Sequence, residues 1–377
     1  MKLGKVETYS LTATDAAEGV RQLQTATELS PHGTRCWGAL ASACQFEGKR
    51  KCANHAIARI LVLSPMAPWV HWEAANYYLW GNRRQQALGQ FRRLLELDPH
   101  YAGATFRASL AATGDPRIVY SAVVTPASSP KLKLAYIDFL SSHGHGDFAF
   151  KVWQKLAAGA AVFDFSAADP YLEHLIHEGK YEQALTVWHD LESRGLVRQS
   201  GDNEGLVFNG GFETVPLNAG FDWRYQQEPY VAINFRGRHP FQGKRCLRIA
   251  FSDVENHQEE PVYQTVPVRA GQTYDLTAEV RSNNITSGSG PCLRVTELAC
   301  PQCLSVSSDP VTGTTPWHQV SLKFRTGPHT TAVRVSVWRA RSLDYPPEIL
   351  GTLWLDQVSL RAIASVTRQA TSAGGSS

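Results

Sequence analysis

A 34-residue period in the first hundred residues constrains the fold of this chain more than any other feature. Three short motifs that end in proline, at 29–31 (LSP), 63–65 (LSP) and 97–99 (LDP), recur at this spacing. A period of about 20–50 residues is typical of structural repeats, in which each unit buries its apolar face against the next. At 377 residues, the chain is also long enough for more than one domain.

Within each repeat, the apolar residues follow the spacing of amphipathic helices. In the second repeat they recur over two successive segments, at Trp37, Leu40, Ala41 and Cys44 and then at Ala53, Ile57 and Ile60. This spacing predicts one apolar stripe on each of two helices. Gly48 suits the turn between the helices, and the proline ends each pair because it cannot continue a helix.

The period and this pattern resemble the tetratricopeptide repeat (TPR). The resemblance implies a helical solenoid whose concave face binds a protein partner. Further helix pairs are expected after Tyr101, where the period weakens, so we expect four to five pairs over residues 16–196. The half-repeat at its start is consistent with a truncated N-terminus or with an irregular cap over residues 1–15. The first reading favours an extracytoplasmic location in the cell envelope and the second a cytoplasmic one.

Helical periodicity ends near Gly195, and residues 197–204 are polar and contain glycine, which indicates a linker. Residues 205–362 contain many short runs with period-two alternation, which predict an antiparallel sandwich of two sheets. Residues 363–377 are small and polar, and we expect a flexible tail. The runs are 246–251, 261–268, 273–281, 293–298, 319–325, 331–339 and 352–361.

Motifs at both ends of this region resemble the jelly-roll carbohydrate-binding modules of xylanases and related glycosidases, which have a galactose-binding-like fold. Residues 206–213 (LVFNGGFE) look like their opening strand, and residues 352–360 (TLWLDQVSL) look like their closing strand. The resemblance covers about residues 204–362 and implies a glycan ligand. The expected fold class is therefore multidomain, an all-α TPR-like solenoid followed by an all-β antiparallel jelly-roll sandwich.

The same resemblance implies a structural calcium ion. The residues that match its carboxylate ligands are Glu213, after the opening strand, and Asp356, in the closing strand. Carboxylate oxygens suit Ca²⁺. Gln357 stands where the family often has a second acid. The alternative is that both acids accept hydrogen bonds from backbone N–H groups.

Alternation along the strands divides core from surface. Leu247, Ile249, Phe251, Leu276, Ala278, Val280, Val333, Val335 and Val337 are expected in the core, and Arg248, Glu279, Arg281, Arg334 and Trp338 on the opposite face. If these strands are neighbours, their polar face offers a tryptophan for sugar stacking and charged groups for hydroxyls or carboxylates. The alternative is an ordinary solvated sheet face.

Other classes of function lack support. The sequence contains no GxSxG, HExxH, P-loop or GxGxxG motif, so we expect no enzyme and no catalytic residues. The net charge of +3 argues against nucleic acid, and no apolar run reaches the roughly 20 residues of a membrane span. Cys300 and Cys303 are expected to form a disulfide in an oxidising compartment and to be reduced elsewhere.

The sequence thus favours a binding and scaffold protein, whose solenoid holds a protein and whose sandwich holds a glycan. Cell-envelope or exopolysaccharide machinery combines both needs. The alternative is a structural adaptor whose sandwich binds protein.

Overall fold

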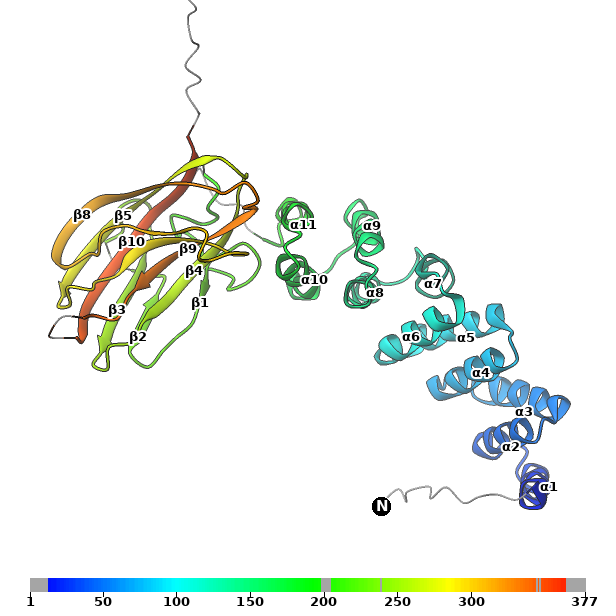
Figure 1. Ribbon diagram of the computed structural model, residues 1–377. Coiled ribbons are helices and arrows are strands. Elements are labelled where there is room, and N and C mark those ends of the chain that lie inside the picture. Colours follow the sequence, from blue (N-terminus) through cyan, green and yellow to red (C-terminus); the bar gives the residue numbers. More distant parts are fainter. Residues whose placement is uncertain (1–12, 198–204, 238, 344, 346, 364–377) are drawn as a thin grey trace, which may run out of the picture. The chain divides into compact units, whose positions relative to one another are not determined.

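The computed structural model describes residues 13–197, 205–237, 239–343, 345 and 347–363. Helices are followed by two antiparallel sheets, which confirms the predicted fold class (Figure 1). The chain divides into two compact units, Met1–Phe163 and Asp164–Ser377. Most of the expected linker, the first twelve residues and the tail from residue 364 lie outside the described residues.

The first unit is a series of antiparallel helix pairs that follow helix α1. Helices α2, α4 and α6 begin at Thr34, Pro68 and Ala102, each 34 residues after the previous one. The 34-residue period is therefore the length of one helix pair with its turns. The helices are α1 (Ala13–Leu29), α2 (Thr34–Phe46), α3 (Arg50–Leu63), α4 (Pro68–Trp80), α5 (Arg84–Leu97), α6 (Ala102–Thr113), α7 (Pro116–Val119), α8 (Pro130–Ser142) and α9 (Gly146–Ala157).

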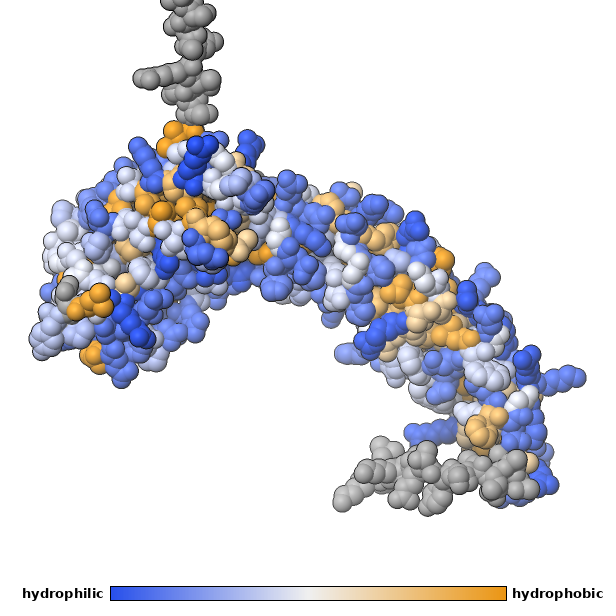
Figure 2. Space-filling view, viewed as in Figure 1, coloured by the Kyte–Doolittle hydropathy of each residue, from blue (hydrophilic) through white to orange (hydrophobic). Residues whose placement is uncertain are grey.

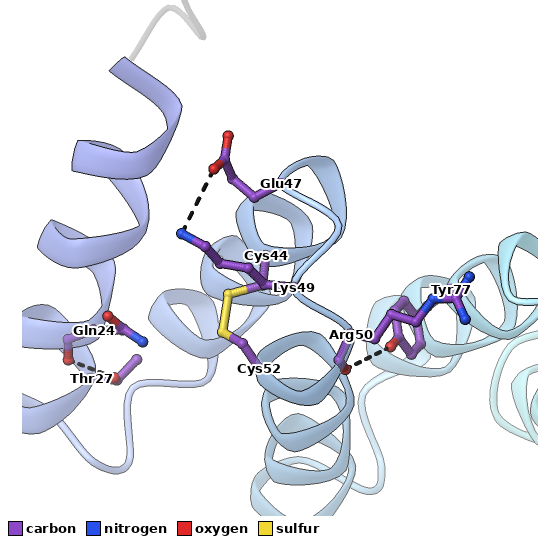
Figure 3. Close-up of a disulfide and its surroundings, with 8 residues drawn as sticks. All are labelled: Gln24, Thr27, Cys44, Glu47, Lys49, Arg50, Cys52 and Tyr77. Carbon is purple, nitrogen blue, oxygen red and sulfur yellow. Dashed lines mark hydrogen bonds and ion pairs between the residues drawn. A yellow bond between two sulfur atoms is a disulfide. The ribbon is translucent and has the colours of Figure 1, made fainter. Parts of the chain in front are cut away.

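The predicted apolar stripes form the core between these helices. Leu40 and Ala41 of α2 pack with Ala53 and Ile57 of α3, and each is at most 3% exposed. Cys44 lies in the same seam and forms a disulfide with Cys52, which joins α2 to α3 (Figure 3). The stripe pattern did not reveal this bond, because a small apolar side chain and a bonded cysteine fit the same buried position.

The period ends after α6 for a local reason. The Asp115 side chain accepts a hydrogen bond from the Arg117 backbone N–H and starts α7, which is only four residues long. A π-helical turn, Tyr120–Val124, follows it, and Ser129 then caps the start of α8. Helices α8 and α9 form one of the further helix pairs expected after Tyr101.

The second unit contains the last helix pair, α10 (Phe165–His177) and α11 (Tyr181–Ser193), together with the sandwich. The Trp188 ring of α11 lies 5.5 Å from Phe208 and 5.9 Å from Phe221, between ring centroids. Glu173 of α10 accepts the Gly220 backbone N–H at 2.8 Å and forms an ion pair with Arg224. The pair is therefore anchored to the loop before the first strand.

Two five-stranded antiparallel sheets form the sandwich. Sheet A has the order β1-β4-β9-β6-β7, and sheet B has the order β2-β3-β10-β5-β8. The strands are β1 (Arg224–Tyr225), β2 (Val231–Asn234), β3 (Leu247–Asp253), β4 (Glu259–Pro267), β5 (Thr273–Ile285), β6 (Cys292–Glu297), β7 (Ser305–Ser307), β8 (Gly313–Arg325), β9 (Ala332–Arg339) and β10 (Ile349–Ala362).

The predicted core alternation is confirmed, because all nine residues assigned to the core are at most 4% exposed. The prediction of an opening strand over residues 206–213 is wrong. This segment is irregular, and Asn209 and Phe212 have positive φ angles, which interrupt an extended backbone. It is held instead by single contacts, such as the two hydrogen bonds between the backbone of Phe208 and the side chain of Gln264.

On the face shown in Figure 2, hydrophilic residues dominate and the hydrophobic ones form separate patches. Among the described residues, no helix is both long and apolar enough to cross a membrane.

Candidate functional site

The outer face of sheet B carries a row of four side chains from four neighbouring strands. Register pairs Asn234 of β2 with Arg248 of β3, Arg248 with Trp354 of β10, and Trp354 with Arg281 of β5. The central guanidinium carbons of Arg248 and Arg281 lie 6.0 and 5.2 Å from the centroid of the Trp354 ring. At such distances the indole ring attracts both cations and holds them on this face.

A loop that includes the described residues 236–237 and 239–245, here the latch loop, lies beside this row. One Asp356 carboxylate oxygen accepts the backbone N–H groups of Phe241 and Gln242, at 3.0 and 3.1 Å. One Glu213 oxygen accepts those of Lys244 and Arg245, at 2.8 and 3.2 Å. The carboxylates of Asp356, in β10, and of Glu213, in the segment before β1, therefore hold the latch loop through four backbone N–H donors.

Glycine allows the latch loop to approach the sheet. A Cβ atom at Gly237 would lie 2.5 Å from the Cys246 sulfur and 3.5 Å from Trp354 Cδ1. Gly243 has a left-handed φ angle of +75°, and a Cβ atom there would lie 2.1 Å from Glu213 Oε1. Gly237 is therefore restricted to glycine by contact with Cys246, and Gly243 by contact with the Glu213 carboxylate that anchors the loop.

Between the row and the latch loop lies a groove of about 360 Å³, here the sheet groove. Its lining contains three arginines, one histidine and one tryptophan but no acidic residue. The nearest acid on β5, Glu279, accepts a hydrogen bond of 3.4 Å from Gln319. The lining residues are Asn234, Arg236, Gly237, His239, Arg248, Arg281 and Trp354.

A pair of aromatic rings lies beside the latch-loop anchor. Phe241 of the latch loop is 49% exposed, and its ring packs edge-on against half-buried Trp317 of β8, with centroids 5.9 Å apart. Apolar ring surface thus accompanies the cationic groove, as is usual where a site binds a sugar ring.

The five residues predicted to share one polar face lie on two faces. Arg248, Glu279 and Arg281 are on sheet B, whereas β9 places Arg334 and Trp338 on sheet A. Arg334 is bonded to Glu260 at 2.9 Å, and Trp338 contacts Arg294. The expectation of a single face was wrong because β9 pairs with β4 and β6, and alternation along a strand does not reveal its neighbours.

Sequence reasoning did not select Trp354 as a site residue. The signal was present, because Leu353 and Leu355 on either side of it are core residues, at 3% and 1% exposure. A residue between two core positions of a strand faces outward.

Glu213 and Asp356, the residues predicted to bind calcium, hold the latch loop in this structure. Both Asp356 oxygens face backbone donors, since the second accepts the Gln357 N–H at 2.8 Å. Burial raises the pKa of Asp356 to about 6, against the lowering effect of these donors. Each N–H group accepted by these carboxylates takes a lone pair that a cation would otherwise use. The calcium ion stays a prediction from the family resemblance. Among the described residues, no group of three or more His, Cys, Asp or Glu side chains is arranged to hold a metal.

Cys300 and Cys303 form a disulfide in the turn between β6 and β7, as expected for an oxidising compartment. With Cys44–Cys52, the described residues contain two disulfides, and Cys36, Cys246 and Cys292 are free.

A larger and more apolar hollow, of about 1020 Å³, lies elsewhere in the second unit. It is formed by the start of α11 and one end of the sandwich. Its apolar lining includes Tyr181, Leu185, Leu206, Val268 and Leu360.

No protein-family model and no curated protein matches this chain. Among solved structures, the chain is similar to a CBM4 module, with 14% identity over 42% of this chain and 99% of that one and a TM-score of 0.32. It is similar to the CBM22-1 xylan-binding domain of Paenibacillus barcinonensis Xyn10C, with 12% identity over 41% and 93% and a TM-score of 0.27. It is also similar to MamA, with 12% identity over 50% and 96% and a TM-score of 0.23.

Proposed function

We propose that this chain is a non-enzymatic binding protein whose sandwich holds a glycan in the sheet groove. The observation that carries the proposal is the row Arg248–Trp354–Arg281, which lies in register across three strands and opens into a groove. Strand-borne side chains keep their positions better than loop-borne ones, so a ligand meets a preorganised site. The motif resemblance to carbohydrate-binding modules at residues 204–362 supports the same class of ligand.

The aromatic surfaces are consistent with a sugar ligand. Sugar rings present C–H groups that pack on aromatic faces, while their hydroxyls take hydrogen bonds from arginine and asparagine. Phe241 and Trp317 supply ring surface, and Asn234, Arg248 and Arg281 supply donors.

The solenoid is proposed to hold a protein partner. A hollow of about 340 Å³ lies between α2 and α4, where Trp69 is 37% exposed and packs over Gly38. An exposed tryptophan beside Arg35 and Glu73 is typical of a surface that binds a peptide. The two disulfides support a place outside the cytoplasm, such as the cell envelope.

A glycan array with the full chain tests the sandwich proposal. We expect specific binding to at least one polysaccharide fragment, and binding that survives addition of EDTA. The absence of binding to any neutral or acidic glycan, with the protein shown to be folded by circular dichroism, would contradict the glycan proposal.

A second candidate function is a protein adaptor, which the hollow beside α11 favours. Its apolar lining, including half-exposed Leu206, suits an apolar peptide better than a sugar. A silent glycan array, together with a protein partner whose binding is lost in Leu206→Asp and retained in Trp354→Ala, would establish this function instead.

A further inference from the structure

We infer that the sheet groove selects acidic sugars, and that a carboxylate of a uronic acid residue binds between Arg248 and Arg281. This inference rests on the proposed glycan function and adds the class of sugar. It follows from the charge of the groove lining and from the positions of Arg248 and Arg281 on either side of Trp354.

The lining of the groove gathers positive charge and contains no acidic side chain. Arg236, Arg248 and Arg281 converge on it, and within the described residues none of the three forms an ion pair. The one side-chain hydrogen bond found for Arg248 is a long one to Thr352 Oγ1, at 3.4 Å. Like charges that share a groove repel one another, which an anionic ligand relieves.

Elsewhere in this unit three arginines do have an acidic partner. Arg224 pairs with Glu173, Arg334 pairs with Glu260, and buried Arg339 pairs with Asp253 at 3.2 Å. The three groove arginines differ from these. Like Arg294 on sheet A, which contacts Trp338 and Ser305 instead, they form no ion pair among the described residues. The groove is distinguished by gathering three such arginines in one lining that contains no acidic residue. Their free N–H groups are the donors that a ligand carboxylate needs.

Trp354 determines the geometry of the clamp. It lies between Arg248 and Arg281 in the sheet register and holds both guanidinium groups near its ring. A guanidinium that is positioned beforehand loses less conformational freedom when it binds a carboxylate in bidentate fashion. A planar carboxylate fits this arrangement, and the hydroxyl-rich sugar ring to which it is attached can reach Asn234 and the latch loop.

The test uses the full chain and the strongest acidic hit of the glycan array, compared with the same oligosaccharide after its carboxyl groups are reduced to alcohols. We expect affinity for the acidic form to exceed that for the reduced form about tenfold or more, because charge-assisted hydrogen bonds are lost. We also expect Arg281→Gln to lower affinity for the acidic form by a similar factor and to change affinity for the reduced form less than about twofold.

Arg334→Gln is the matched control, since it removes an arginine from the outer face of sheet A and is expected to leave both affinities unchanged. Equal binding of acidic and reduced forms, or array hits that are all neutral, would overturn the acidic specificity and leave the glycan function standing. Hits confined to sulfated glycans would also overturn the carboxylate clamp. An array without hits would remove both proposals.

Discussion

Arg281 and Trp354 are direct cross-strand partners, and the guanidinium carbon of Arg281 lies 5.2 Å from the centroid of the Trp354 ring. One pair thus joins a cation and an aromatic ring on the middle strands of sheet B. Because β5 and β10 are held on both sides by other strands, the pair cannot shift without breaking the sheet. This rigidity distinguishes the groove from an ordinary polar sheet face.

The contact between Gly220 and Trp188 predicts a large effect of a small substitution. Gly220 has a φ angle of +56°, and a Cβ atom there would lie 2.3 Å from the Trp188 ring. We expect Gly220→Ala to destabilise the second unit by about 2 kcal/mol or more, through overpacking and backbone strain. Thermal unfolding of the full chain measures the effect.

Gly271→Ala is the control for that experiment, since Gly271 has a φ angle of +66° but no atom within 4 Å of a Cβ. It should cost only the backbone strain, about 1 kcal/mol. Equal effects of the two substitutions would show that α11 does not pack on this loop.

The carboxyl group of Glu259 predicts a pH dependence of stability. Glu259 is 6% exposed, and among the described residues neither of its oxygens has a hydrogen-bond partner. All five donors of nearby Arg339 are used elsewhere, including one by Asp253. Burial, and then the charge of Asp253, raise the pKa of Glu259 to about 7.

Because folding raises the pKa of Glu259, the unfolded chain releases the carboxyl proton at a lower pH than the folded protein does. The contribution of the protonated Glu259 carboxyl to the free energy of unfolding is complete below its pKa in the unfolded chain, near 4.5. It is lost as the pH rises through its folded-state pKa of about 7. Between about pH 5 and pH 8 the wild type should lose roughly 2–3 kcal/mol relative to Glu259→Gln, which cannot titrate. Urea unfolding of both proteins at the two pH values checks this, and parallel profiles would refute it.

The disulfides predict a definite thiol count. Of seven cysteines, three are free, so alkylation of the denatured, unreduced protein should label three thiols, and reduction should expose the remaining four. Replacing Cys44 and Cys52 by alanine should lower the stability of the helix pair by about 2–3 kcal/mol, as for other short disulfide loops. Seven reactive thiols in protein isolated from its native compartment would contradict the oxidised state and the proposed location.

The latch loop predicts how the protein responds to calcium. Since Glu213 and Asp356 accept backbone N–H groups, we expect EDTA and added Ca²⁺ to give the same unfolding temperature. A calcium ion at these two acids remains the alternative prediction from the family resemblance. A clear rise in unfolding temperature with Ca²⁺ that is absent in Asp356→Asn would support the ion.

Sequence reasoning predicted the fold well because both halves have periodic patterns. The 34-residue spacing defines where α2, α4 and α6 begin, and alternation identifies core residues such as Leu247 and Val335. Strand order has no such signal, so Arg334 and Arg281 were expected on one face although they lie on different sheets. The disulfide of Cys44 and the role of Asp356 depend on contacts with other segments, which no local pattern encodes.

The proposal that the sheet groove holds a glycan is tested most directly by comparing two tryptophans on opposite sheets. Trp354→Ala and Trp338→Ala remove the same side chain, but only the first lies in the sheet groove. In isothermal titration of the full chain with the strongest ligand of the glycan array, we expect Trp354→Ala to lower affinity at least about tenfold and Trp338→Ala to bind like the wild type. Loss of binding in Trp338→Ala alone, with Trp354→Ala unaffected, would place the site on sheet A and contradict the proposed site in the sheet groove.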